Sequence, residues 1–250
     1  ALEQAYAELA TAKSKAEAAN LDKTRFVAAA SHDLMQPLNA ARLYVTSLIE
    51  RQNGSDKNVA EDGRLIGNVD ASLEAVEDIL GALLDISRLD TGAMKPEFVS
   101  FRIDDLLKQL VVEFEPMARE KGLEFGYAPC SLSVRSDRRL LRRLLQNLVS
   151  NAIKYTPNGG RITVRWGATA DTVSFEVEDT GIGIPEADVN RVFERFYRVD
   201  KARGRAEGST GLGLSIVKHL VQAMRGQVRV HSTLGKGTTF RVTLPRAGSA

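Results

Sequence analysis

The apolar residues in the first third of the chain recur at the spacing of helices. From residue 2 to residue 19 they alternate steps of three and four, as in the seam of a coiled coil. The pattern continues over 27–48, breaks at the polar stretch 51–58, and returns over 65–83. It predicts a coiled-coil-like signalling helix over 1–24, followed by two long antiparallel helices.

Each of these two helices has one apolar face, so the pair cannot close a core alone. A second copy would bury both faces in a four-helix bundle, and the pattern therefore predicts a homodimer. Gly92 and Pro96 end the second helix, which sets the helical domain at 25–95. Large aliphatic residues would carry the interface: Leu34, Leu38, Val45, Leu73, Val76 and Leu80.

Beyond Pro96 the pattern mixes helices with strands. Helical periodicity covers 101–122 and 141–156. Alternation of apolar and polar residues predicts strands over 161–168, 172–179, 226–233 and 238–245. A largely antiparallel sheet with one covered face is the expected result, so residues 96–250 should form an α+β sandwich. The fold class is thus a two-domain chain: an all-α hairpin that dimerises, then this sandwich.

Composition narrows the possible functions. The 250 residues are 43% hydrophobic and 26% charged, enough for two small soluble domains. A formal charge of +2 gives no reason to expect nucleic-acid binding. The single cysteine, Cys130, excludes an intrachain disulfide and a thiolate metal cluster, which fits a cytoplasmic location. No run of about 18 apolar residues occurs, so we expect no membrane contact from this segment.

One histidine occupies an unusual setting in "SHDLMQPL", residues 31–38. His32 lies roughly 160° from the mean direction of the apolar stripe, so it should face solvent. A surface histidine without a role is one interpretation. The other is a nucleophile, because neutral imidazole has a free lone pair and Asp33 could hydrogen-bond the second ring nitrogen. Pro37 indicates a local bend in the helix.

A polar helix face follows in "QNLVSNAIKYT". Asn147, Asn151 and Lys154 recur at steps of four and three, so they share one face of the helix. Carboxamide oxygens and an ammonium group can hold Mg²⁺ and phosphate oxygens together. The alternative is an ordinary solvated face, for which Glu and Lys are the more usual residues.

Two glycine-containing loops complete the pattern. "DTGIGIP" follows a predicted strand, and its Asp179 carboxylate could accept a hydrogen bond from an exocyclic amine such as that of adenine. "GSTGLGLSIVKHL" precedes an apolar helix, whose free N–H groups and dipole attract phosphate. Each loop alone could be a surface connection. Their order along the chain makes a ligand site the better interpretation.

Together these motifs resemble the catalytic core of a sensor histidine kinase of two-component signalling. The resemblance runs from about Lys23 to Pro245. It matches six motifs in order: "SHDLMQPL" resembles the H-box, "NLVSNAIKYT" the N-box, "DTGIGIP" the G1 box, "FERFYRVD" the F-box, "GSTGLGL" the G2 box and "GKGTTF" the last glycine motif. It implies a dimerisation and histidine-phosphotransfer domain followed by a Bergerat-type ATP-binding domain.

The resemblance also implies residue roles. His32 would be the phosphoacceptor, Asp33 would orient or deprotonate it, and Gln36 would position water for dephosphorylating the partner. Asn151 would hold Mg²⁺. The implied nucleotide-binding residues are Asn147, Asn151, Lys154, Tyr155, Asp179, Gly181, Gly183, Arg195, Arg198, Gly208, Gly211, Leu212, Gly213 and Thr238. Residues 185–210 would form a mobile lid that Phe193 and Phe196 attach to the domain.

The implied reaction is transfer of the γ-phosphoryl group of ATP to His32 and then to an aspartate of a response-regulator receiver domain. Dephosphorylation of that partner is an additional implied activity. Two other classes remain: a Bergerat ATPase or Ser/Thr kinase, which would lack the H-box, and a dimeric pseudokinase, which would lack Asn151 or Asp179. The chain has all three features. We expect it to be the cytoplasmic part of a larger sensor protein.

Overall fold

The structure is a computed structural model that forms two compact units, Ala1–Leu83 and Leu84–Ala250, which are considered separately. It describes residues 4, 11, 13–14, 30–31, 33–51, 59–90, 96–199 and 211–246. His32, Gly208 and most of the helix expected over 1–24 lie outside the described residues. Among the residues described, no helix has both the length and the hydrophobicity needed to cross a membrane.

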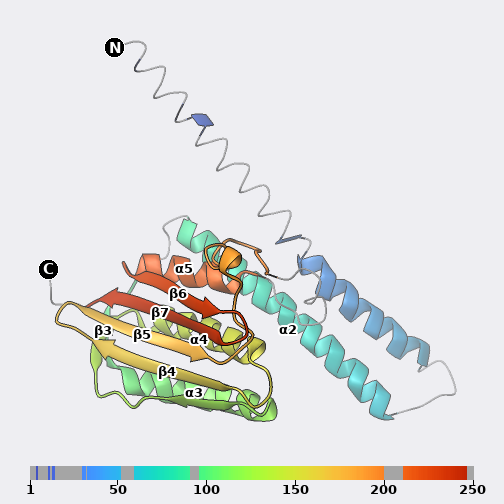
Figure 1. Ribbon diagram of the computed structural model, residues 1–250. Coiled ribbons are helices and arrows are strands. Elements are labelled where there is room, and N and C mark those ends of the chain that lie inside the picture. Colours follow the sequence, from blue (N-terminus) through green and yellow to red (C-terminus); the bar gives the residue numbers. More distant parts are fainter. Residues whose placement is uncertain are drawn as a thin grey trace. The chain divides into compact units, whose positions relative to one another are not determined.

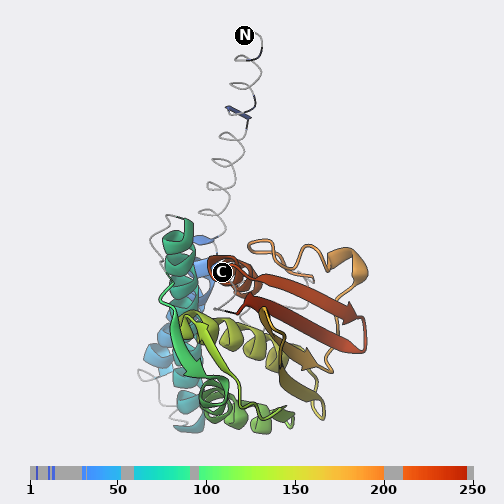
Figure 2. The same cartoon turned by 90° about the vertical axis from the view of Figure 1, so that its left-hand side faces the viewer.

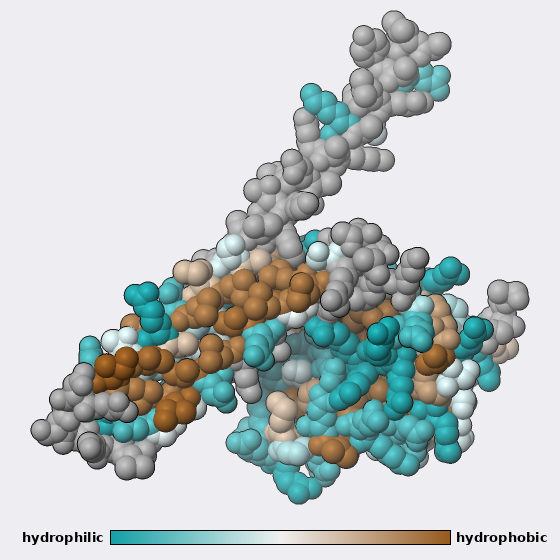
Figure 3. All heavy atoms as spheres, turned by 180° about the vertical axis from the view of Figure 1, so that it is seen from behind, coloured by the Kyte–Doolittle hydropathy of each residue, from teal (hydrophilic) through white to brown (hydrophobic). Residues whose placement is uncertain are grey.

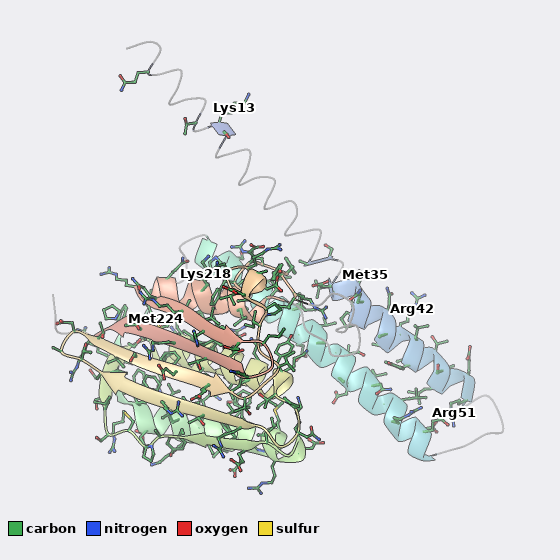
Figure 4. The ribbon with its side chains drawn as sticks, viewed as in Figure 1. Lys13, Met35, Arg42, Arg51, Lys218 and Met224 are labelled. Atoms are coloured by element: carbon green, nitrogen blue, oxygen red, sulfur yellow. The ribbon has the colours of Figure 1, made fainter. Side chains whose placement is uncertain are left out.

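A helical hairpin makes up the first unit. It consists of a helical segment over 33–51 and α2 (Val59–Asp90), whose residues from Leu84 onward belong to the second unit (Figure 1). Arg51 ends the first helix and lies beside the start of α2 (Figure 4). Its guanidinium pairs with Glu61 at 2.7 Å and with Asp62 at 3.1 Å. These ion pairs connect the two helices across the predicted turn.

Large aliphatic side chains are exposed along both hairpin helices. Apolar surface extends along the hairpin in Figure 3. Six of these side chains are between 41% and 60% exposed: Leu38, Val45, Ile49, Ile66, Leu73 and Leu80. Four of the six were predicted to carry a dimer interface. A contiguous apolar surface of this kind marks an interaction site.

The second unit contains a five-stranded sheet. Its strands are β2 (Glu124–Tyr127), β4 (Arg161–Ala168), β5 (Thr172–Asp179), β6 (Gln227–Thr233) and β7 (Gly237–Pro245), in the order β2-β4-β5-β7-β6. The β2–β4 pair is parallel and the other pairs are antiparallel. The four predicted strands and the largely antiparallel pairing are therefore confirmed.

Helices cover one face of this sheet. They are α3 (Ile103–Glu120), α4 (Arg138–Tyr155) and α5 (Gly213–Ala223), which form a single layer in Figures 1 and 2. Alternate residues of β5, among them Phe175 and Val177, are buried against this layer. The opposite face carries ion pairs such as that between Arg165 and Glu178. Alternation in the sequence thus gave the correct covered face, as expected for an α+β sandwich.

The starts of two predicted helices were wrong: α4 begins at Arg138 instead of residue 141, and the helix expected from residue 101 begins later. Residues 101 and 102 were expected in a helix, but they belong to β1 (Val99–Arg102), which pairs antiparallel with β3 (Ser133–Ser136). The helix begins at Ile103, whose N–H donates to the Leu132 carbonyl at 3.0 Å. Pairing with a distant strand therefore overrides the helical periodicity at these two positions.

Candidate functional site

The polar face of α4 lies against the start of α5. The Asn147 amide nitrogen donates to the Arg143 carbonyl one turn earlier, at 2.8 Å. A Cβ placed on Gly213 would lie 3.1 Å from Asn147 Oδ1 and 3.7 Å from Asn151 Nδ2. The opposite face of α4 is buried through Leu141, Leu144, Leu145 and Leu148. The structure therefore brings two predicted carboxamides to the first residue of the α5 helix, and a side chain at residue 213 would crowd them.

Asp179 ends β5, and its carboxylate is buried. Its Oδ1 accepts hydrogen bonds from the Gly181 N–H at 2.8 Å and the Thr238 N–H at 3.2 Å. Its Oδ2 accepts none from the part of the chain that the structure describes. Burial raises the pKa of Asp179, and the two backbone hydrogen bonds act in the opposite direction. One carboxylate oxygen is thus fixed by the fold, and the other can accept from a ligand.

The glycine loop after Asp179 is held against α4 and the β6–β7 turn. A Cβ on Gly181 would lie 2.5 Å from the Tyr155 carbonyl oxygen, which also accepts from the Ile182 N–H at 3.1 Å. Gly183 has a φ of +70°, and a Cβ there would lie 2.2 Å from the Thr233 carbonyl oxygen. Only glycine fits this approach. The end of α4, the end of β5 and the β6–β7 turn therefore meet at one place.

Lys121 supports the end of α4, although sequence reasoning missed it. Its ammonium group donates to the carbonyl oxygens of Ile153 and Lys154, both at 2.7 Å. A cation at a helix C-terminus satisfies carbonyls that lack partners within the helix and complements the helix dipole. Lys121 follows the last residue of α3, and nothing in its local sequence indicates a contact with α4. Lys154 and Tyr155, both predicted site residues, lie at the end that Lys121 holds.

The described part of the predicted lid, 185–199, is packed against the domain. It includes the short 3₁₀ helix η1 (Glu186–Asp188). The Phe193 ring meets the Phe240 ring edge to face, with centroids 6.2 Å apart. The Phe196 N–H donates to the Gly211 carbonyl at 3.1 Å. Phe193 therefore attaches the lid through its ring, and Phe196 attaches it through its backbone N–H.

The lid arginines have different surroundings from those expected. Arg195 Nη2 lies 3.2 Å from Nε2 of His219 in α5, a histidine that belongs to none of the six motifs. Arg198 is partly buried. Leu212 is completely buried, so its side chain belongs to the core. Gly211 has a φ of +67°, which glycine adopts without strain.

Two family models match the chain. Residues 22–92 match the His Kinase A (phospho-acceptor) domain. Residues 136–248 match the histidine kinase-, DNA gyrase B-, and HSP90-like ATPase family. The chain belongs to the sensor histidine kinases.

Individual relatives and solved structures match most of this chain. The sensor-like histidine kinase SenX3 of Mycolicibacterium smegmatis is 36% identical over 241 residues, which cover 92% of this chain and 60% of SenX3. Full-length ShkA in complex with AMPPNP is 26% identical with a TM-score of 0.65, over 93% of this chain and 46% of ShkA. ThkA, solved in complex with the response regulator protein TrrA, is 20% identical with a TM-score of 0.68. The match spans 89% of this chain and 61% of ThkA, and it shows the fold alone.

Two of the three predicted H-box residues, Asp33 and Gln36, lie in the first helix of the hairpin. Asp33 is partly buried and Gln36 is exposed, while His32 lies outside the described residues. Met35, which directly precedes Gln36 and is labelled in Figure 4, is 55% exposed. The structure describes the surroundings of the H-box, and the roles of its three predicted residues stay predictions.

The donor set near α5 suits Mg²⁺ held together with phosphate. Within the described residues, no cluster of three or more His, Cys, Asp or Glu side chains could hold a metal ion. Asn151 is partly exposed, and its side chain makes no hydrogen bond to the residues described. Mg²⁺ commonly takes one or two protein oxygens and completes its shell with phosphate oxygens and water. Asn151 fits that requirement.

Proposed function

We propose that this chain is an ATP-dependent protein histidine kinase that phosphorylates its own His32 and passes the phosphoryl group to an aspartate of a receiver domain. The observation that carries the proposal is the presence of a phospho-acceptor domain that includes residue 32 and an ATPase domain in the same chain. The proposal assigns residues 1–24 to a signalling helix, 25–95 to phosphotransfer and 96–250 to ATP binding.

The proposed nucleotide position follows from the polar groups of the site. Asp179 Oδ2 would accept from the adenine amine, because Oδ1 is occupied by two backbone N–H groups. Asn147, Lys154 and Tyr155 would line the nucleotide, with Gly181, Gly183 and Thr238 shaping its adenine end. The phosphates would lie at the start of α5, where free N–H groups and the dipole favour anions. Gly208 and Arg198 belong to the same proposal.

Transfer would proceed by in-line attack of the His32 imidazole nitrogen on the γ-phosphorus. A nitrogen–phosphorus bond forms, the bond from phosphorus to the bridging oxygen breaks, and ADP leaves. Asp33 would accept a hydrogen bond from the other ring nitrogen, which keeps the lone pair on the attacking one. Mg²⁺, bound through Asn151 and the phosphates, would neutralise phosphate charge. Positioning and charge neutralisation therefore account for most of the proposed rate.

Two partners belong to the proposal. A second copy of this chain would cover the exposed side chains of the hairpin, including Leu38 and Leu73, in a four-helix bundle. A receiver domain would accept the phosphoryl group, in agreement with the ThkA complex with a response regulator. Gln36 would position water if the chain also dephosphorylates that partner. Because the reaction uses ATP, we propose a cytoplasmic location.

The decisive experiment is incubation of the full chain with γ-labelled ATP and Mg²⁺. Transfer of label that acid removes and base preserves is expected for phosphohistidine. His32→Gln should abolish labelling and leave ATP affinity unchanged, because the acceptor and the nucleotide site lie in different domains. Labelling of His32→Gln, or an acid-stable label on the wild-type chain, would contradict the proposal.

A further inference from the structure

His219 makes two hydrogen bonds, one through each nitrogen of its ring. Its Nδ1 lies 2.7 Å from the Ser215 carbonyl oxygen, and its Nε2 lies 3.2 Å from Arg195 Nη2. A carbonyl oxygen only accepts, so Nδ1 carries the hydrogen. A guanidinium only donates, so Nε2 accepts. With Nδ1 as the donor, this ring acts through Nε2 as an acceptor for the lid arginine.

The contact connects the lid to the helix that would face the phosphates. Arg195 and Phe196 are consecutive, and the Phe196 N–H donates to the Gly211 carbonyl immediately before α5. His219 lies further along α5, on the same helix as Gly213. Two adjacent lid residues are thus attached at two separate points, one at the start of α5 and one inside it. Attachment at two points fixes the direction of the lid segment as well as its distance from α5.

This geometry changes the role of Arg195. The family resemblance implied that Arg195 binds the nucleotide, but its guanidinium is directed to an imidazole on α5. By donating a hydrogen bond to His219, the Arg195 guanidinium attaches the lid to α5. Arg198, three residues later, belongs to the segment whose direction the attachment fixes. A charged donor on a neutral acceptor is among the stronger hydrogen bonds in proteins.

We propose that His219 is a positioning residue for catalysis, and that it holds lid residues 193–198 over the nucleotide site by accepting a hydrogen bond from Arg195. The part of this inference that concerns ATP rests on the proposed function. The attachment itself is a property of the chain without ligand. A rival role predicts the opposite result: if Arg195 is a phosphate ligand, removal of His219 leaves ATP binding intact or tighter.

The test is a double-mutant cycle on the full chain with His219→Leu, Arg195→Ala and the combined variant. We expect each single change to weaken ATP binding by roughly tenfold, and the combined variant to be no weaker than either. Adenosine binding, measured by the same titration, should stay unchanged because adenosine has no phosphates for the lid to enclose. His219→Gln should restore ATP binding, because its amide oxygen can accept near the position of Nε2.

Lys218→Leu is the matched control. Lys218 is the exposed neighbour of His219 on α5 (Figure 4), and its replacement should change neither affinity. Additive losses in the cycle, or ATP binding to His219→Leu at wild-type strength, would overturn the proposal. An equal loss of adenosine and ATP binding would also overturn it, since that result indicates general damage to the domain.

A second readout works without nucleotide. Amide hydrogen exchange of residues 193–198 in the ligand-free chain should be faster in His219→Leu and Arg195→Ala, and should return to the wild-type rate in His219→Gln. Unchanged exchange in both single variants would refute the attachment. If the wild-type chain binds no ATP, the proposed function fails, and the exchange rates alone then decide whether His219 holds the lid.

Discussion

The change of Asp179 to asparagine separates folding from binding at the nucleotide site. Both backbone N–H groups that hold this side chain donate to Oδ1, at 2.8 Å from Gly181 and 3.2 Å from Thr238. The amide oxygen of asparagine can accept both. The amide nitrogen then occupies the place of Oδ2, so a donor replaces the acceptor proposed for the adenine amine. We expect the fold to persist and nucleotide binding to be weakened.

The magnitude follows from the kind of hydrogen bond removed. A hydrogen bond to a charged group contributes about 1.5–3 kcal/mol, so Asp179→Asn should weaken ATP binding by roughly 10- to 150-fold. Stability should behave differently. Because burial raises the pKa of Asp179, ionising it costs free energy in the folded chain. The amide avoids that cost, and the free energy of unfolding at neutral pH should be unchanged or higher.

The raised pKa also predicts a pH dependence with a definite sign. In the range between the ordinary pKa of an aspartate and the raised value, the folded chain binds more protons than the unfolded chain. The contribution of Asp179 to stability therefore falls as pH rises through this range, and Asp179→Asn should lack this fall. ATP affinity should change in the opposite direction: it should decrease on acidification, because protonation places a donor on the carboxyl group.

Calorimetric titration with ATP and Mg²⁺ measures the binding, and urea unfolding over a pH series measures the stability. Glu178→Gln is the matched control, since the adjacent carboxylate pairs with Arg165 on the polar face of the sheet. It should bind ATP as the wild-type chain does. An Asp179→Asn variant that binds ATP within twofold of wild type would refute the reasoning, and so would one that is unfolded.

Three further outcomes are expected. Thr156→Val should raise the free energy of unfolding by roughly 1 kcal/mol in urea titrations, because the buried Thr156 hydroxyl has no hydrogen-bond partner among the described residues; a loss of stability would contradict this. Lys121→Met should lower that free energy by roughly 1–3 kcal/mol and Lys121→Arg by less, since the two α4 carbonyls lose a charged donor; equal losses would show that charge is irrelevant there. Leu73→Glu should give a monomer at micromolar concentration by light scattering, because Leu73 is 46% exposed in a single chain and a charge would be buried in the dimer; a persistent dimer would place the interface elsewhere.

Local sequence patterns predicted the helices and four strands of the ATP-binding half, but not β1, β2 and β3. The bounds expected for β4 and β5 are those observed. In a sheet covered on one face, successive residues of a strand point alternately to the core and to solvent, so the strand can be recognised from its own sequence. The start of α4 is also encoded locally, since the Asp137 side chain accepts from the Arg139 and Leu140 N–H groups at 2.9 Å and 3.1 Å. Motif order was sufficient to indicate the family.

Tertiary structure decided which residues support these motifs. Nothing near Lys121 indicates the carbonyl of Lys154, which lies 33 positions away. Asp179 and Thr238 are 59 positions apart, and only the β5–β7 pairing brings the Thr238 N–H to Oδ1 and leaves Oδ2 for a ligand. The family resemblance implied that Arg195 binds the nucleotide, yet its guanidinium contacts His219. Periodicity and capping act within a few residues and can be recognised in the sequence. Contacts between distant side chains depend on how the sheet and helices assemble, and they are fixed only when the chain has folded.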